Sequence, residues 1–451
     1  MVKLNKLDLP YSHVLVLGLA KSGTAAAKAL LSFGYKVRVN DRDAKENDNI
    51  VQELTSSDAE VVLGTNPVQI LEDIELIVKN PGIPYDNPIL MEAQERGISI
   101  ITEIEIAGIL AKGNIIGITG SNGKTTTTML VNDMLQKSEV PVKIAGNIGV
   151  VATEVAQNLT KDETLVLELS SFQLQGIKKF KPKIAVLLNI FEAHLDYHKT
   201  IKNYRQAKCN IFKNQTADDY LIYNADDPYI VHAVKSTVSN TIPFSISQKV
   251  ENGVWVDEQY IYFKDEKIIE RQTIVLVGQH NLENILAAIA AAKLSGATNE
   301  GIQKVLMTFT GVKHRLQYID KINDRLFYND SKATNILATQ KALTSFKQPT
   351  ILLAGGLDRG NGFADLIPYL TYVKAMVVFG QTAIKLKELA LEAEIDQVVM
   401  VSDMQAAVNE GYAISEAQDV ILLSPACASW DQYRTFEERG DMFIQAVHKL
   451  K

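Results

Sequence analysis

The segment from Gly117 to Thr127 reads Gly-Ile-Thr-Gly-Ser-Asn-Gly-Lys-Thr-Thr-Thr, and these residue types can hold a phosphate chain. An apolar run precedes the glycines and a helical run follows them, which predicts a turn between a strand and a helix. In such a turn, successive backbone N–H groups and the N-terminus of the helix face the anion. Lys124 is expected to reach the terminal phosphates, and the Thr125 hydroxyl to bind Mg²⁺.

The spacing of this loop differs from the strict pattern G-x-x-x-x-G-K-[ST], because Ile118 stands where that pattern has its first glycine. What remains is the shorter Gly120-x-x-Gly123-Lys124-Thr125. A glycine-rich turn with a solvated lysine is the alternative. The apolar strand before the loop and the helix after it favour an ATP site.

Other groups could serve a metal. Glu168 ends the apolar run Thr164–Leu169, where a strand beside the phosphate loop would present an acid to Mg²⁺, although a solvated acid is the alternative. His194 and His198 are four residues apart, which invites a zinc reading. There is no H-E-x-x-H order and no third ligand nearby, so Mg²⁺ with one imidazole and carboxylates is the other reading. Lys208, in a predicted amphipathic helix over 201–212, is expected from composition alone to be solvated.

Near the N-terminus, Gly18, Ala20 and Gly23 follow an apolar strand, and Asp41 ends the next strand, 18 residues after Gly23. This nearly matches a dinucleotide fingerprint but lacks its middle glycine. A hydride-transferring dehydrogenase, a purely structural turn and a nucleotide-sugar site are three open readings. The loop Asn80-Pro81-Gly82 follows a later strand of the same predicted sheet and favours a ligand at its carboxyl edge.

Two loops in the last third of the chain also follow predicted strands. They are Asp330–Asn335 and Ser424–Ser429, and ligand contacts concentrate on such loops. Cys427 lies in the second loop. No histidine pairs with it in the sequence, so we interpret it as a small buried residue rather than a nucleophile.

Strand-like and helical runs alternate along the chain in three series, which predicts three consecutive α/β domains with limits near residues 102 and 312. Strands are expected at 13–19, 37–40, 61–63, 76–79 and 99–101, then from 115 and at 164–169, 184–190 and 220–224, and finally near 326–329, 351–354, 375–379, 398–401 and 420–423. Helices are expected at 21–33 and 282–295. Between residues 253 and 277, short alternating runs predict an antiparallel meander with strands at 254–256, 260–263 and 274–277.

Composition narrows the function classes. The 451 residues suit about three domains, and the net charge of −7 without a long basic run argues against a nucleic-acid partner. Only Cys209 and Cys427 occur, which excludes a disulfide framework and suits the cytoplasm. No run reaches the length of a membrane span, and residues 13–20 lack the flanks of a signal peptide, so we expect neither membrane insertion nor export.

Taken together, these motifs resemble the Mur ligases, the ATP-dependent amide-forming enzymes of peptidoglycan precursor synthesis. The resemblance covers essentially the whole chain, and three of its segments are typical of the members that add D-glutamate: Glu168–Leu174, Ser424–Tyr433 and Phe436–Gly440. The other motifs that carry it are the phosphate loop, Gly146–Gly149, His194, Tyr204–Lys208, His280–Asn284, His314-Arg315 and Asn329–Asn335.

The resemblance implies a domain organisation, two substrates, a cellular compartment and an oligomeric state. A Rossmann-like domain at 1–102 would bind the UDP-sugar, a central P-loop ATPase-like domain with extra antiparallel strands at 103–311 would bind ATP, and a Rossmann-like domain at 312–451 would bind the amino acid. The substrates would be UDP-N-acetylmuramoyl-L-alanine and D-glutamate. The enzyme would act in the cytoplasm as a monomer.

The resemblance also implies residue roles. Lys124, Asn147, Glu168, His194 and Lys208 would be catalytic, with two Mg²⁺ sites held by Thr125, Glu168, His194 and Lys208, the last as a carbamate. The ATP residues would be Gly120, Ser121, Asn122, Gly123, Lys124, Thr125, Thr126, Asn281, Asn284, Arg315 and Asp330. The UDP-sugar would meet Gly18, Ala20, Lys21, Ser22, Asp41 and Gly82, and D-glutamate would meet Lys332, Thr334, Ser429 and Phe436.

The sequence departs from the family pattern at two places, and three competing functions stay open. Gly355-Gly356-Leu357-Asp358-Arg359 shifts the acid of the family pattern and replaces its lysine, and Arg42 follows Asp41 on the uracil side. Another ligase of the group, an NAD-dependent oxidoreductase using the first domain, and a regulatory P-loop switch are the alternatives.

Overall fold

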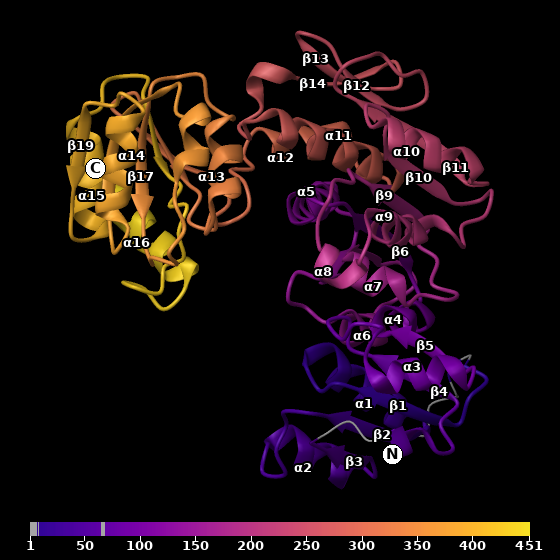
Figure 1. Ribbon diagram of the computed structural model, residues 1–451. Helices are drawn as coiled ribbons and strands as arrows, with labels where there is room; N and C mark the ends of the chain where they lie inside the picture. The colour runs from indigo at the N-terminus through magenta and orange to yellow at the C-terminus, as the bar shows by residue number, and fades with distance from the viewer. Residues whose placement is uncertain (1–6, 8, 65–67) are drawn as a thin grey trace. The chain divides into compact units, whose positions relative to one another are not determined.

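The computed structural model describes Leu7 and residues 9–64 and 68–451. The chain forms two compact units, one of residues 1–272 with 283–305 and one of residues 273–282 with 306–451. Three β-sheets with helices between their strands account for both units, and the α/β class predicted from the alternation of runs is confirmed (Figure 1). Among the described residues, no helix is both long and apolar enough to cross a bilayer.

The first sheet is a five-stranded parallel sheet with the order β3-β2-β1-β4-β5. The strands are β1 His13–Leu17, β2 Lys36–Asp41, β3 Glu60–Leu63, β4 Leu76–Lys79 and β5 Ser99–Thr102, with helices α1 Lys21–Ser32, α2 Asn49–Ser56 and α3 Pro88–Glu95 and the 3₁₀ turn η1 Val68–Leu71. Apolar residues fill both faces, as a sheet covered by helices requires. The strand order reverses between β1 and β4, so the loops after these two strands meet. Asn80 Nδ2 accordingly donates to Ser22 Oγ at 3.1 Å.

The second sheet has nine strands in the order β14-β13-β12-β11-β10-β9-β6-β8-β7. The strands are β6 Asn114–Thr119, β7 Val142–Gly146, β8 Thr164–Glu168, β9 Ile184–Leu187, β10 Tyr220–Asn224, β11 Asn240–Ser245, β12 Val254–Val256, β13 Tyr260–Phe263 and β14 Glu266–Glu270. The helices are α4 Glu103–Leu110, α5 Lys124–Lys137, α6 Ala152–Gln157, α7 Ser171–Gln175, α8 Leu195–His198, α9 Ile201–Cys209, α10 Pro228–Ala233, α11 Gln279–Leu294 and α12 Asn299–Leu306, with 3₁₀ turns at Asn210–Phe212, Val234–Ser236 and Arg271–Thr273. Strands β8 and β9 flank β6 in parallel, so the loops after all three share one edge.

The predicted antiparallel extension is present, but its third strand was misplaced. β13 pairs antiparallel with β12 and with β14, whereas residues 274–277 form no strand. The two-residue turn Lys264-Asp265 places Glu266–Glu270 directly beside β13, with Ile268 and Ile269 buried. The apolar run at 274–277 instead leaves the sheet, and Val275 N donates to Leu306 O.

The third sheet has the order β15-β16-β20-β17-β18-β19, with only β15 antiparallel to its neighbour. The strands are β15 Gln317–Ile322, β16 Arg325–Asn329, β17 Thr350–Gly355, β18 Val373–Phe379, β19 Gln397–Met400 and β20 Val420–Leu423. The helices are α13 Ile336–Leu343, α14 Ala383–Glu392, α15 Met404–Ala413 and α16 Phe436–His448, with a 3₁₀ turn at Ala364–Tyr369. Because β16, β20 and β17 are adjacent and parallel, the two loops singled out from the sequence lie together at one edge.

Candidate active site

The phosphate loop joins β6 to α5, and its glycines are required by the local packing. Gly123 has a φ of +84° and caps α5, and a Cβ at this position would collide with the side-chain amide of Asn284. A Cβ on Gly120 would lie 2.9 Å from that of Leu188. The loop is held by Asn189, whose Oδ1 accepts from Asn122 N at 2.9 Å. These contacts hold the backbone N–H groups of the loop at the N-terminus of α5, the arrangement that binds phosphate.

Two lysines converge on one carbonyl of this loop. Lys124 Nζ donates to Gly120 O at 2.9 Å, and Lys208 Nζ donates to the same oxygen at 2.7 Å. Lys208 is only 2% exposed, so its expected place in solvent was wrong. It lies on the apolar face of α9 with Tyr204, whose hydroxyl is 2.9 Å from Ser121 Oγ. Burial, and secondly the Lys124 ammonium, hold the pKa of Lys208 well below its usual range. A neutral amine is therefore accessible at this position.

Glu168 ends β8 in a fully buried position beside the same loop. Its Oε1 accepts from Asn147 Nδ2 at 3.0 Å, whereas its Oε2 is buried and has no hydrogen-bond partner among the described residues. A buried carboxylate oxygen without a partner is costly, and a hard cation such as Mg²⁺ would satisfy it. The donor set at this point therefore fits a magnesium ion.

The two histidines of the His194 segment differ in their surroundings. His194 has a φ of +54°, and its largely exposed ring packs edge-on against Phe172 with centroids 5.0 Å apart. Partial desolvation, and secondly the Lys208 charge, lower its pKa, which favours the neutral imidazole that can bind a metal. His198 is buried against Phe172, hydrogen-bonds Ser171 Oγ at 2.9 Å, and has a pKa lowered to about 4, chiefly by burial. In the part of the chain that the structure describes, no group of three or more His, Cys, Asp or Glu side chains is placed to hold a metal ion by itself.

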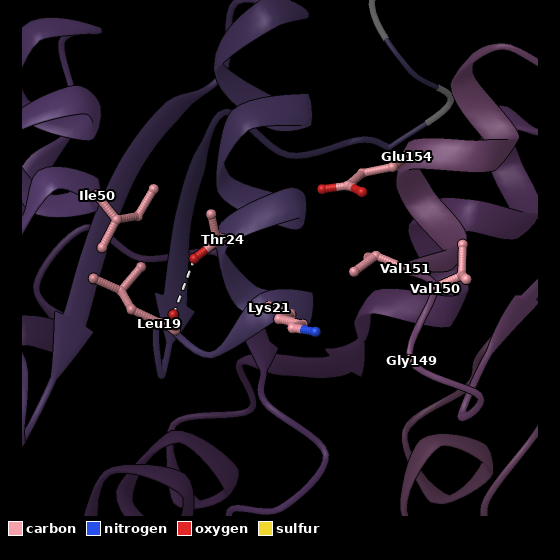
Figure 2. Close-up of a pocket in the computed structure, with 8 residues that line it drawn as sticks. All are labelled: Leu19, Lys21, Thr24, Ile50, Gly149, Val150, Val151 and Glu154. Carbon is pink, nitrogen blue, oxygen red and sulfur yellow. Dashed lines mark hydrogen bonds between the residues drawn. The ribbon is translucent and has the colours of Figure 1, made fainter. Parts of the chain in front are cut away.

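A pocket of about 590 Å³ opens between the loop after β1 and the segment before α6. Figure 2 shows Lys21, at the start of α1, and Glu154, on α6, on opposite sides of it. Its lining residues are Leu19, Lys21, Thr24, Ile50, Gly149, Val150, Val151 and Glu154. Of the residues expected at the UDP-sugar site, only Lys21 lines this pocket. Gly18 and Ala20 lie in the loop after β1, Ser22 in the first turn of α1, Asp41 at the end of β2 and Gly82 in the loop after β4.

The Asp41 carboxylate connects the segments after β1 and β2. Its Oδ2 accepts from Leu19 N at 2.6 Å, and its Oδ1 accepts from Asp43 N and Ala44 N, both at 2.9 Å. The carboxylate thus links the end of β2 to the loop after β1. On the other side, Gly82 N donates to Asn80 Oδ1 at 3.0 Å.

The asparagines expected at the adenine are both buried. Asn284, in the first unit, packs its amide against Gly123 of the phosphate loop. Asn281, in the second unit, donates from Nδ2 to Val277 O at 2.7 Å. Arg315, also in the second unit, is half-buried near Asp330 and lowers the pKa of that carboxyl slightly, although burial outweighs it.

The residues expected to bind D-glutamate lie at the carboxyl edge of the third sheet. Lys332 is exposed, with its Nζ 5.4 Å from the centre of the Phe436 ring, and Thr334 follows it in the same loop. Ser429 is buried, and its Oγ has no hydrogen-bond partner among the described residues. Cys427 is buried, as predicted. The Lys332 ammonium and the Ser429 hydroxyl suit a small anionic ligand with polar groups.

Arg439 holds this edge together, and residue-by-residue analysis of the sequence missed it. Its fully buried guanidinium donates to Ser331 O at 2.9 Å, Cys427 O at 3.0 Å and Gly355 O at 3.3 Å, one carbonyl at or just after the end of each of three strands. Arginine at the start of α16 otherwise looks like a solvated helix residue. The one feature of the sequence that pointed to Arg439 was its place in the segment Phe436–Gly440, which carries the family resemblance.

Asp330 provides a pH-dependent test of this packing. Its oxygens accept from Leu316 N and Ser424 Oγ, each at 3.0 Å, and burial raises its pKa from 3.8 to about 7. Because the folded state binds the proton more tightly, this group destabilises the fold progressively as the pH rises from about 4 to 7. We expect Asp330→Asn to raise the free energy of unfolding by roughly 2 kcal/mol at pH 8 and by almost nothing at pH 4, measured by urea denaturation. An equal gain at both pH values would contradict this assignment.

Comparison with known proteins gives consistent matches along the chain. Residues 12–102 match the family model "Mur ligase MurD-like, N-terminal domain", residues 118–292 match "Mur ligase middle domain", and residues 314–427 match "Mur ligase, glutamate ligase domain". A protein from Oceanobacillus iheyensis named UDP-N-acetylmuramoylalanine--D-glutamate ligase is 61% identical over 98% of this chain and 99% of its own length. A Bacillus cereus protein of the same name is 56% identical over 97% of this chain and 98% of its own.

Solved structures share the fold at low identity. UDP-N-acetylmuramoyl-L-alanyl-D-glutamate--2,6-diaminopimelate ligase has a TM-score of 0.58 at 17% identity, covering 99% of this chain and 94% of that one. MurF ligase from Thermotoga maritima, in complex with ADP, has a TM-score of 0.57 at 19% identity, covering 92% and 96%. At such identities these two structures support the architecture alone.

Proposed function

The chain belongs to the Mur ligase family, and we propose that it joins D-glutamate to the L-alanine carboxylate of UDP-N-acetylmuramoyl-L-alanine, converting ATP to ADP and phosphate. It is an ATP-dependent amide-forming ligase of peptidoglycan precursor synthesis. The observation that carries the choice of substrate is the 61% identity, over nearly the full length of both chains, to a ligase named for D-glutamate. We assign residues 1–102 to the nucleotide sugar, 103–311 to ATP and 312–451 to the amino acid.

The chemistry requires activation of a carboxylate, because a carboxylate is a poor acceptor for an amine. The substrate carboxylate would attack the γ-phosphate of ATP, and the resulting acyl phosphate would accept the amine of D-glutamate and release phosphate. Lys124 and the N–H groups of the phosphate loop would stabilise the charge on the transferring oxygens. Asn147, which hydrogen-bonds Glu168, would orient the reacting carboxylate. Most of the rate enhancement would come from positioning and electrostatics.

The residues around the phosphate loop suit ATP and magnesium. Thr125 and Glu168 would hold one Mg²⁺, and His194 and Lys208 would hold a second. When bound, the ions would neutralise the phosphate charge. Further ATP contacts would come from Gly120, Ser121, Asn122, Gly123, Thr126, Asn281, Asn284, Arg315 and Asp330.

Lys208 would serve a metal as a carbamate. Its amine would add to CO₂ and release one proton, which converts a cation into an anion with oxygen ligands. The neutral amine is the reactive form, and burial of Lys208 favours that form. The carbamate nitrogen keeps one N–H, which could still donate to Gly120 O.

The pocket between α1 and α6, together with the loops after β1, β2 and β4, would hold the UDP-sugar. Gly18, Ala20, Lys21, Ser22, Asp41 and Gly82 are the residues assigned to it. D-glutamate would meet Lys332, Thr334, Ser429 and Phe436, where the free Oγ of buried Ser429 and the exposed ammonium of Lys332 suit a carboxylate. We further propose a cytoplasmic location, because both cysteines are free and buried, as suits a reducing compartment. We propose a monomer from the family resemblance alone.

Phosphate release by the purified protein tests this function. The protein would receive Mg-ATP with UDP-N-acetylmuramoyl-L-alanine and D-glutamate, L-glutamate, L-lysine or no amino acid. We expect release only with the nucleotide sugar and D-glutamate together, with ADP formed in equal amount. Release that needs no sugar would indicate a P-loop switch, and an absorbance change of a nicotinamide cofactor without phosphate release would indicate an oxidoreductase.

A further inference from the structure

Lys79 is a buried cation that the proposed reaction does not use. It ends β4, its side chain is 1% exposed, and none of the carboxylates in the described part of the chain forms an ion pair with it. Its Nζ donates to Asn80 O at 3.1 Å, Pro81 O at 3.2 Å and Tyr197 Oη at 3.1 Å. Burial lowers its pKa to about 7. A lysine in such a place is costly unless every N–H is satisfied, as it is here.

The partner hydroxyl comes from a distant part of the chain. Tyr197 lies on α8, in the segment that begins with His194, and it lies 118 residues from Lys79 in sequence. Besides accepting from Lys79, its hydroxyl lies 3.0 Å from Pro81 O and 3.1 Å from Ile83 O, and it can donate to one of them. The hydroxyl is therefore surrounded by the loop that carries Gly82.

The ring of Tyr197 packs beside the residues around His194. It packs edge-on against Phe172 with centroids 4.5 Å apart, and the same Phe172 ring supports His194 at 5.0 Å. Through one side chain, the loop after β4 is thus tied to the segment that carries His194. Simple filling of a core would need no ammonium and no hydroxyl at this point, because an apolar pair could fill the same volume without burying a charge.

We propose that Lys79 and Tyr197 are positioning residues that hold the nucleotide-sugar loop and the His194 segment in a fixed relation, so that the bound carboxylate substrate is presented to the phosphate loop. The proposal rests on the function proposed above. Neither side chain needs to touch substrate. Their effect would fall on the nucleotide sugar and on the Mg²⁺ assigned to His194, whose proposed sites lie in the first unit, and not on D-glutamate, whose assigned residues belong to the second.

Tyr197→Phe tests the proposal, because it removes the hydroxyl and keeps the ring on Phe172. We expect the KM for UDP-N-acetylmuramoyl-L-alanine and the Mg²⁺ concentration for half-maximal rate each to rise about 5- to 10-fold, the effect of losing one ordinary hydrogen bond. The KM for D-glutamate should not change. Calorimetric titration with the nucleotide sugar alone, without ATP, should show the same rise in Kd.

Two further variants complete the design. Lys79→Met should shift the same constants as Tyr197→Phe. The double variant should raise these constants little further, since each single variant already removes the same Lys79–Tyr197 hydrogen bond. Tyr85→Phe is the matched control, because the ring of Tyr85 also faces the Lys79 ammonium, at 5.0 Å, but its hydroxyl takes no part in the link. Wild-type constants are expected for it.

An unchanged sugar KM and Kd in Tyr197→Phe would overturn the proposal. So would a D-glutamate KM that rises as much as that of the sugar, since this would indicate general damage rather than positioning. Failure of the proposed function is distinguishable, because it would appear as absence of ligation by the wild-type protein.

Discussion

Replacing Glu168 by glutamine is expected to lower kcat by about 10³-fold while the protein stays folded. Glutamine has the same shape and can still accept the hydrogen bond from Asn147. It lacks the negative charge, and in place of the unpaired Oε2 it would bury an N–H₂ group that cannot bind a cation. Steady-state phosphate release at saturating substrates, together with a Mg²⁺ titration, measures the effect.

Glu163→Gln is the matched control for this variant. Glu163 lies just before the same strand but is paired with Lys143 at 3.0 Å, at the end away from the phosphate loop. We expect its activity to equal that of the wild type. An active Glu168→Gln enzyme with unchanged Mg²⁺ dependence would remove Glu168 from the metal site.

Replacing Lys208 by methionine should produce a comparable loss, about 10³-fold, and for a distinct chemical reason. Because the proposed carbamate of Lys208 forms from CO₂, wild-type activity should fall when CO₂ is stripped from the buffer and return when bicarbonate is added. Acidification protonates the amine and releases CO₂, so more bicarbonate should be needed at pH 6 than at pH 8. The methionine variant should not respond to bicarbonate at either pH.

Lys202→Met provides the comparison on the same helix, because Lys202 is exposed. It should keep wild-type activity and the wild-type bicarbonate response. If the wild-type enzyme showed no response to CO₂ removal at either pH, the carbamate would be excluded and Lys208 would act as an amine or ammonium.

The phosphate loop could be predicted from sequence because its determinants are local. Glycines at 120 and 123, an apolar run before them and a helix after them specify both the turn and its chemistry. The convergence of the loops after β1 and β4 was predictable as well, because parallel strands place their carboxyl ends at one edge.

The buried cations were not predictable in this way, because their burial depends on distant partners. Lys79 ends a strand as a solvated lysine could, and part of what encloses it is Tyr197, from another part of the chain. Lys208 is a partial exception. It lies four residues after Tyr204 on the apolar side of its helix, so the helical period contained a signal that composition hides.

The third strand of the meander was misplaced for a physical reason of the same kind. The apolar run at 274–277 has strand composition but forms no strand, whereas the more polar Glu266–Glu270 follows a tight turn and pairs with β13. Pairing geometry outweighs composition over such short runs. The individual ligand roles come from the family resemblance and stay predictions for the variants above to test.

The central claim is that one oxygen of the substrate carboxylate leaves with the phosphate. UDP-N-acetylmuramoyl-L-alanine with both carboxylate oxygens labelled with a heavy isotope, incubated with ATP, Mg²⁺, D-glutamate and the enzyme, tests it by mass spectrometry. We predict one labelled oxygen in each released phosphate, one retained in the new amide, and a product heavier by one D-glutamate residue. Unlabelled phosphate, or phosphate released without that product, would contradict the account.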